Sequence, residues 1–222
     1  MNASGCGSGG YPVIAPANPL RGVTADSACT ASLAGQVDGP VLLAGHSYGG
    51  AVISSAAASA PNVVGLVFVA AFAPDEGERP GEAAGTSADS ILGPAQVPYR
   101  YPAGPDGATA AEFGVGPARL REVFAADLPA EQAALLAATQ RPVAAAAFTD
   151  VCGPPAWKKL PCWAVAATGD KAAGTGITRS MAQRAGAEIT ELDGSHVIMI
   201  SQPQAVAGVI VKAAEAAVAA RG

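Results

Sequence analysis

The chain is poor in charged residues, aromatic residues and histidine. Only 14% of its 222 residues are charged, 5% are aromatic, and there are two histidines. The net charge of −5 provides no positive field that would attract nucleic acid or an anionic membrane surface. We therefore expect neither as a partner, and a small molecule is the expected ligand.

Cysteine is scarce as well, and its spacing argues against a metal site. The four cysteines are Cys6, Cys29, Cys152 and Cys162, and no two of them form a C-x-x-C motif. With so few histidines beside them, a zinc site is not expected. They are interpreted as small buried apolar residues, and a Cys152–Cys162 disulfide is the alternative for an exported protein.

Long apolar runs and a recognisable leader are also missing. No run reaches the roughly 18 apolar residues that span a bilayer. The first ten residues, MNASGCGSGG, have no basic region followed by an apolar stretch. A cytoplasmic location is therefore the expectation. Half of the residues are hydrophobic, which favours a folded chain with a substantial core.

Short apolar runs alternate with helical stretches along most of the chain. The run PVLLAG at residues 40–45 is typical of a parallel strand buried on both faces. Alternating strands and helices predict an α/β fold, with a mainly parallel sheet covered by helices on both faces. The other expected strands lie at residues 11–16, 63–72, 161–168 and 187–192, and the expected helices at 25–37, 50–60, 178–186 and 203–220.

The segment from about residue 75 to residue 156 differs in composition from its surroundings. Proline, glycine and charged residues cluster in its first part, and two helices are predicted at 117–126 and 129–140. We interpret it as a mainly helical cap inserted into a single domain that spans residues 1–222.

Residues 45–50, GHSYGG, place a serine between glycines directly after the predicted strand. The pattern G-x-S-x-G alone is a weak signal, but its position between a strand and a helix is that of a nucleophile elbow. Ser47 is therefore the predicted nucleophile. Gly45 and Gly49 are expected to allow close approach of the backbone, and the Tyr48 N–H is expected to stabilise an oxyanion.

The two histidines leave one candidate for the catalytic base. His46 adjoins Ser47 inside the elbow, and its side chain is expected to point away from the serine. His196 lies in the sequence LDGSHVIM, between the last predicted strand and the last helix. We therefore predict that His196 accepts the proton of Ser47.

Asp170 is the predicted acid that orients His196, because it follows the preceding strand in the sequence AATGDK. Asp75, one strand earlier, is an alternative, whereas Asp193 is expected to shape the loop of His196. The resulting chain order of Ser47, Asp170 and His196 is nucleophile, acid and base.

Five blocks of sequence, in order, carry a resemblance to a known family: YPVIAPANPLRG, GHSYGGAVI, FVAAFAPDEGE, AATGD and GSHVIMISQP. Together they resemble the α/β-hydrolase family of small esterase-like enzymes of actinobacterial type. The resemblance runs from Tyr11 to the end of the chain. It implies a serine hydrolase that needs no cofactor, with Ser47, Asp170 and His196 as its triad.

The resemblance also exposes a departure near the start. Members of the family begin with a strand and an H-G motif that supplies a second oxyanion donor, but only ten residues precede Tyr11 here. Residues 12–15 could pair directly with 41–45, the N-terminal residues could enter the sheet, or a second subunit in a homodimer could fill the gap. Backbone N–H groups of residues 4–10 could replace the missing donor.

The favoured function is a serine carboxylesterase that cleaves small acyl esters through an acyl-enzyme intermediate. A lyase or perhydrolase of the same fold is the first alternative, since fold alone does not define the reaction. A truncated homologue that binds a ligand with little or no turnover is the second. Residues expected to line the substrate pocket are His46, Phe72, Phe124, Trp157 and Val197.

Overall fold

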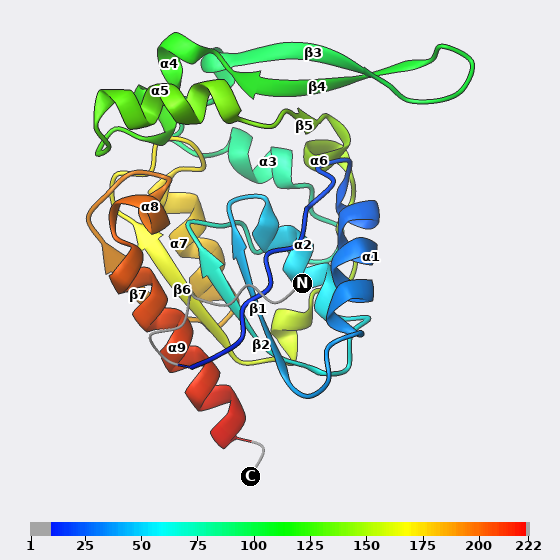
Figure 1. Ribbon diagram of the computed structural model, residues 1–222, viewed down its shortest axis with the longest axis vertical. Helices are drawn as coiled ribbons and strands as arrows, with labels where there is room; N and C mark the ends of the chain where they lie inside the picture. Colours follow the sequence, from blue (N-terminus) through cyan, green and yellow to red (C-terminus); the bar gives the residue numbers. More distant parts are fainter. Residues whose placement is uncertain (1–9, 221–222) are drawn as a thin grey trace.

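The computed structural model describes residues 10–220 and has a parallel sheet at its centre (Figure 1). Its strands are β1 (Val41–His46), β2 (Val63–Val69), β6 (Cys162–Ala167) and β7 (Glu188–Leu192), in the order β1-β2-β6-β7. All three pairings are parallel. The predicted α/β class is thus confirmed, and the carboxyl ends of the four strands meet at one edge of the sheet.

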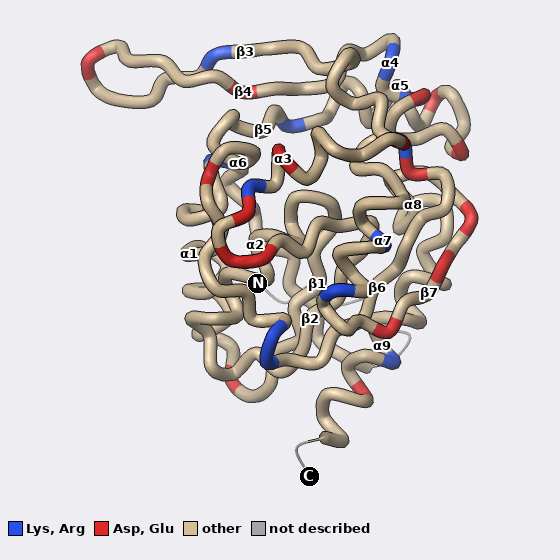
Figure 2. Tube along the Cα trace, turned by 180° about the vertical axis from the view of Figure 1, so that it is seen from behind, with Lys and Arg blue, Asp and Glu red and all other residues tan. Residues whose placement is uncertain are grey.

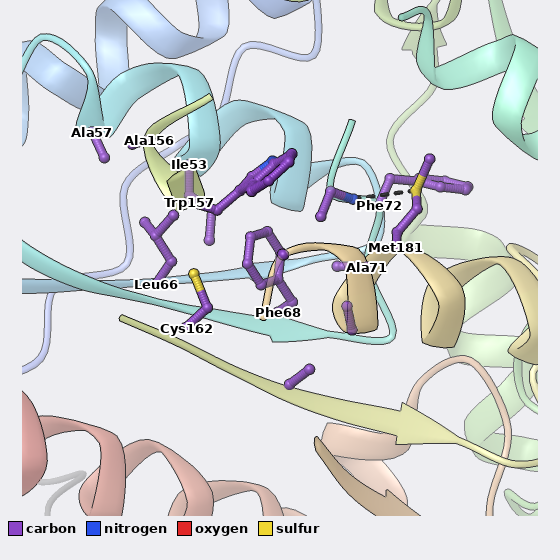
Figure 3. Close-up of a cluster of buried hydrophobic side chains, with 14 of the residues drawn as sticks. Ile53, Ala57, Leu66, Phe68, Ala71, Phe72, Ala156, Trp157, Cys162 and Met181 are labelled. Carbon is purple, nitrogen blue, oxygen red and sulfur yellow. Dashed lines mark hydrogen bonds between the residues drawn. The ribbon is translucent and has the colours of Figure 1, made fainter. Parts of the chain in front are cut away.

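One face of the sheet is covered by α1 (Val23–Ala34), α2 (Gly49–Ala57) and α7 (Thr175–Arg184). Leu66 and Phe68 of β2 project from the sheet into a cluster with Ile53 of α2 and Trp157 (Figure 3). Leu66 and Phe68 are almost completely buried, at 0% and 1% exposed. Burial of such side chains, at about 25 cal/mol per Å² of apolar surface, holds these helices on the sheet.

The opposite face is covered by α9 (Pro203–Ala219), which follows the short α8 (Ile198–Ser201). Val67 and Val69 alternate along β2 with Leu66 and Phe68, so their side chains point to the opposite face. There they pack with Val206 and Ala213 of α9. Burial on both sides explains the unbroken apolar runs of β2 and β6. The same prediction for residues 40–45 is wrong, because β1 is mostly half-buried and Ala44 is exposed. Figure 2 shows charged residues around the periphery, whereas β1, β2 and β6 contain none.

The predicted strand at residues 11–16 is not a strand of the sheet. Within this stretch only Val13 forms an isolated bridge. Pro12 and Pro16 have no N–H to donate to a ladder, and Val13 and Ile14 remain 46% and 54% exposed. Among the described residues, β1 therefore has a strand partner on its β2 side only. The predicted roles of residues 1–9 in the sheet lie outside the described part of the chain.

The segment between β2 and β6 contains both predicted helices and also an antiparallel hairpin that the sequence did not predict. Figure 1 shows this hairpin extending along the end of the molecule farthest from the C-terminus. It joins a three-stranded sheet of order β3-β4-β5, so the description as mainly helical was incomplete. The elements are α3 (Pro80–Gly85), η1 (Gly93–Ala95), β3 (Gln96–Pro102), β4 (Thr109–Val115), α4 (Pro117–Phe124), α5 (Ala130–Thr139), β5 (Val143–Ala144), α6 (Ala146–Thr149) and η2 (Ala156–Lys158).

Cys152 and Cys162 are buried free thiols and form no disulfide with each other. Burial raises the pKa of the Cys152 thiol to about 11 and that of Cys162 to about 12. Both are therefore protonated near neutral pH, as expected for cysteines with an apolar packing role. Cys29 is exposed, so the prediction of burial is wrong for that residue. From residue 10 to residue 220, no helix is both long and apolar enough to cross a membrane.

Candidate active site

Ser47 lies in a strained turn between β1 and α2. Its φ of 54° falls in the left-handed region that residues with a side chain rarely adopt. The strain is held by the backbone on both sides: the Ser47 N–H donates to Val69 O at 3.2 Å. The Ser47 carbonyl accepts from Gly50 N at 3.1 Å and from Phe72 N at 3.2 Å. An observed outlier of this kind, enforced by its surroundings, is typical of a functional residue.

Two glycines allow this turn to pack against its neighbours. A Cβ on Gly45 would lie 2.5 Å from Gly49 O, and a Cβ on Gly50 would lie 2.2 Å from Phe72 O. Gly49 has no atom within 4 Å of its Cβ position. The predicted need for glycine therefore holds at Gly45 and is wrong at Gly49. Gly50, which faces the loop after β2, is the second position where no side chain fits.

Gly50→Ala is expected to lower the free energy of unfolding by about 1–3 kcal/mol or more, because a methyl group meets backbone that cannot move freely. Gly49→Ala is the matched control, since Gly49 begins α2 and its Cβ position is open. That variant should be neutral or up to about 1 kcal/mol more stable. Urea unfolding of both variants measures the difference, and equal stabilities would contradict the packing of the turn.

Asp170 and His196 form a buried pair at the edge of the sheet where Ser47 lies. Asp170 follows β6 and His196 follows β7, and both side chains are 0% exposed. His196 Nδ1 lies 2.8 Å from Asp170 Oδ2, and Asp170 Oδ1 accepts from the N–H groups of Ala172 at 2.9 Å and Ala173 at 3.0 Å. Because the carboxylate only accepts, Nδ1 is the donor and Nε2 of the neutral ring is the acceptor.

Burial opposes the charge on Asp170, but the attraction and hydrogen bond of His196 outweigh it. Together with the backbone N–H of Ala172, they hold the pKa of the Asp170 carboxyl below its ordinary value. The carboxyl is thus ionised at neutral pH. An ionised carboxylate in this position stabilises a positive charge on the His196 ring.

Nε2 of His196 has no hydrogen-bond partner in the part of the chain that the structure describes, although it is buried. Buried ring nitrogens are nearly always paired, so an open one requires an explanation. Ser47 Oγ does not bond to it here, and such hydrogen bonds are often long before substrate binds. The open Nε2 can accept a proton from a group that enters the site.

Two side chains pack against the His196 ring. The ring of His46, the last residue of β1, has its centroid 4.5 Å from that of His196, and His46 Nε2 lies 2.9 Å from the His196 carbonyl oxygen. Phe124, at the end of α4, contacts the ring edge-on at a centroid distance of 4.8 Å. The side chain of His46 thus points to the His196 loop, while its backbone leads into Ser47.

The His196 loop is also held by residues that the sequence did not single out for the site. Ser195 N–H donates to Asp127 Oδ2 at 3.0 Å, and Ser195 Oγ donates to Phe124 O at 2.9 Å. Asp127 lies between α4 and α5. No local pattern indicates these contacts, because they join residues far apart in the chain.

Among the described residues, neither the alternative acid Asp75 nor Asp193 forms a hydrogen bond with the His196 ring. Asp75 forms an ion pair with Lys158, and Asp193 accepts from Thr168 Oγ1 at 3.0 Å. Asp193 therefore shapes the loop, as its position in the sequence suggested.

The backbone N–H of Tyr48 stands at the start of α2 and makes no backbone hydrogen bond among residues 10–220. The side chain of Tyr48 points toward α1, where its hydroxyl donates to Asp26 Oδ2 at 2.9 Å. Burial and this bond raise the pKa of the Tyr48 phenol. The N–H is thus available for an oxyanion. The second donor predicted from residues 4–10 falls almost entirely outside the described residues.

The residues expected in a substrate pocket separate into two groups. Phe124 and Val197 pack together in the cluster beside His196. Phe72 and Trp157 lie instead in the buried core on the α2 side of the sheet, 4% and 8% exposed, and the Trp157 indole donates to Pro74 O at 3.0 Å. Their size and apolar character suggested a pocket wall, whereas packing assigns them to the core.

A cleft of about 430 Å³ lies between α3 and α7. Its walls include both charged and apolar residues, and none of them belongs to the elbow or to the His196 loop. They are Glu78, Arg79, Glu82, Ala83, Thr86, Ile177, Ser180, Met181 and Arg184. This cleft is thus separate from Ser47 and His196.

The neutral state of His46 makes stability depend on pH. Burial, followed by the proximity of His196, lowers the pKa of His46 to about 3 from its ordinary value of 6.5. Below pH 6.5 the unfolded chain therefore binds a proton that the folded chain does not, so stability falls as the pH decreases. We expect a loss of about 1–2 kcal/mol between pH 7 and pH 5 from this residue.

Urea unfolding at pH 7 and pH 5, for the native chain and for His46→Gln, measures this effect. Glutamine does not titrate, so the variant should lose less stability over the same interval. Carboxyl groups with ordinary pKa values are mostly ionised at pH 5 and are the same in both proteins, so their contribution cancels in the comparison. An equal loss in both proteins would contradict the burial of a neutral His46.

Comparison with known proteins agrees with the α/β fold. Residues 2–209 match the model of the alpha/beta hydrolase family. Polyneuridine aldehyde esterase superposes with a TM-score of 0.72 at 19% identity, over 88% of this chain and 80% of that one. No curated protein sequence matches significantly.

Two further solved structures have similar folds. A pyrethroid hydrolase from Sphingobium faniae JZ-2 has a TM-score of 0.69 at 22% identity, over 88% of this chain and 78% of that one. The H243A variant of tomato methylketone synthase I has a TM-score of 0.69 at 20% identity, over 88% and 80% of the two chains. At identities of 19–22%, these similarities show a shared fold and do not by themselves show a shared reaction.

Proposed function

The chain belongs to the alpha/beta hydrolase family, and from this premise we propose that it is a serine carboxylesterase acting on small acyl esters. The observation that supports this most is the buried Asp170–His196 pair, whose Nε2 is open at the edge of the sheet where the strained Ser47 lies. A base held in this tautomer is what a serine nucleophile requires. We also propose that the segment from residue 75 to residue 156 is the cap over this site.

In the proposed reaction Ser47 Oγ attacks the ester carbonyl carbon while its proton passes to His196 Nε2. The Tyr48 N–H donates to the oxyanion of the tetrahedral intermediate, and Asp170 stabilises the imidazolium. When the intermediate collapses, the bond from carbon to the leaving oxygen breaks and Nε2 returns its proton to the alcohol. Water, deprotonated by the same nitrogen, then cleaves the acyl-enzyme and restores the serine.

The apolar surroundings of His196 support an apolar acyl group. Phe124 lies edge-on to the His196 ring. Val197 directly follows His196 in the chain, and its side chain is 8% exposed. Apolar walls around a few polar groups are typical of small-molecule sites. Two of the similar folds are, by name, an esterase and a pyrethroid hydrolase, which makes ester cleavage the first reaction to test.

A lyase of the same fold is the second candidate, because one similar structure is a methylketone synthase variant complexed with β-ketoheptanoate. The same base could remove the hydroxyl proton of a cyanohydrin as its bond to cyanide breaks. For a β-keto acid, loss of CO2 would leave an enolate, which the protonated base could convert to the ketone. Release of ketone from a β-keto acid, or of aldehyde from a cyanohydrin, would indicate this reaction. Perhydrolysis is recognised by adding peroxide to the ester assay.

The test is hydrolysis of p-nitrophenyl acetate and butyrate at neutral pH. We expect a burst of p-nitrophenolate, approaching one equivalent per chain, if deacylation is slower than acylation, and steady turnover otherwise. Absence of both for every ester tried would contradict the proposed function.

A further inference from the structure

His46 contacts the proposed base in two ways that the triad does not require. It ends β1, directly before Ser47, and its Nε2 lies 2.9 Å from the carbonyl oxygen of His196. Its ring also lies against the His196 ring, with the planes tilted by 50°. We propose that His46 is a positioning residue that holds His196 at the angle needed to accept the proton of Ser47. This inference rests on the proposed function.

The direction of the hydrogen bond follows from its partner. A backbone carbonyl only accepts, so His46 Nε2 carries the proton and donates. Its Nδ1 is then unprotonated, because burial keeps the ring neutral by lowering the pKa of His46 to about 3. A neutral donor matters here, because a second positive ring against His196 would oppose the imidazolium that forms during the reaction.

The contact links the strand of the nucleophile to the loop of the base. Asp170 holds Nδ1 of His196 and Phe124 contacts the ring edge, but both belong to elements other than β1. The contacts of His46 thus hold His196 in place relative to β1. Because Ser47 directly follows His46 in the chain, they also hold His196 in place relative to Ser47. A displacement of about 1 Å at a reacting group can lower a rate about 100-fold.

Two substitutions of similar length separate the hydrogen bond from the packing. His46→Gln retains a neutral N–H donor near the original position, whereas His46→Met fills the space without a donor. For p-nitrophenyl butyrate we expect His46→Met to lower kcat about 10- to 100-fold with KM within about threefold. His46→Gln should restore kcat to within about fivefold of the native chain.

Native-like kcat in both variants would overturn the proposal. An equal loss in both, or a loss confined to KM, would assign His46 to packing and would overturn it as well. Unfolding in urea at pH 7 shows whether both variants fold, so that a rate is compared only between folded proteins.

Nitrogen NMR of the untagged chain gives a readout that needs no turnover, because the sequence contains only two histidines. We expect His46 with Nε2 protonated and Nδ1 unprotonated from pH 5 to pH 8. Both variants lose the ring contact but only His46→Gln keeps the donor, so the His196 ring nitrogen signals should shift more in His46→Met than in His46→Gln. A charged or Nδ1-protonated His46, or unchanged His196 signals in His46→Met, would overturn the proposal. If the native chain hydrolyses no ester, the proposed function fails. The spectra would still show whether His46 donates a hydrogen bond to the His196 loop.

Discussion

Asp170→Asn is expected to lower kcat for ester hydrolysis about 10⁴-fold while the chain remains folded. The asparagine amide can present an N–H to Nδ1 of His196 in place of a carboxylate oxygen. The ring would then carry its proton on Nε2 and could no longer accept one from Ser47. The amide oxygen can still accept from the N–H groups of Ala172 and Ala173, so the loop should keep its shape.

Asp193→Asn provides the matched control. Asp193 lies in the His196 loop, but its carboxylate accepts from Thr168 Oγ1 and does not touch the ring. This variant should keep kcat within a few-fold of the native value. The two variants are compared by kcat at saturating p-nitrophenyl butyrate. A loss of less than tenfold in Asp170→Asn, or an equal loss in Asp193→Asn, would show that Asp170 does not orient the base.

Ser47→Ala should have the larger effect and remove enzymatic hydrolysis almost completely, by about 10⁴-fold or more. Without Oγ no acyl-enzyme can form, so the burst of p-nitrophenolate should disappear as well. The backbone strain at this residue is held by hydrogen bonds of its own N–H and carbonyl, which alanine retains. The fold should therefore survive the substitution.

Ser54→Ala, in the following helix, is the control for a serine hydroxyl close to the elbow. Ser54 Oγ is buried and has no hydrogen-bond partner among the described residues, so its removal should leave activity unchanged and stability equal or higher. Retention of more than about 1% of the native rate in Ser47→Ala would mean that another group performs the chemistry.

The strands at residues 63–72, 161–168 and 187–192 and the place of Ser47, Asp170 and His196 after strands could be predicted, because both follow from local patterns. Unbroken apolar runs indicate strands buried on two faces, and residues that follow parallel strands must lie at one edge of the sheet. The φ of Ser47 then follows from the sharp change from strand to helix. Two observations were enough to predict that His196 pairs with Asp170, which the structure places 2.8 Å away. The two residues follow strands that end at the same edge of the sheet, and the chain has only two histidines.

Other features depend on contacts that no local pattern encodes. The stretch 11–16 has the composition of a strand, but its prolines lack N–H donors and it is not part of the sheet. The hairpin of β3 and β4 contains prolines and glycines that indicate a loop when they are considered alone. Trp157 suggested a pocket wall by its type and lies in the core, because packing rather than composition decides burial.

The contacts of the His196 loop illustrate the same limit at the site. His46 was expected to point away from Ser47, but nothing in the sequence indicates that its ring meets the carbonyl of His196. The bond from Ser195 to Asp127 likewise joins distant segments. Sequence patterns thus indicate the proposed reacting groups, and the tertiary structure identifies the groups that hold them.

The proposed nucleophile is tested most directly by a fluorophosphonate probe followed by intact-mass and peptide mass spectrometry. Such probes react with a serine whose proton is taken by a neighbouring base. The native chain is expected to gain one adduct, located on Ser47, and Ser47→Ala is expected to gain none. A native chain that remains unlabelled, or an adduct that persists unchanged in Ser47→Ala, would contradict the assignment of Ser47 as an activated nucleophile.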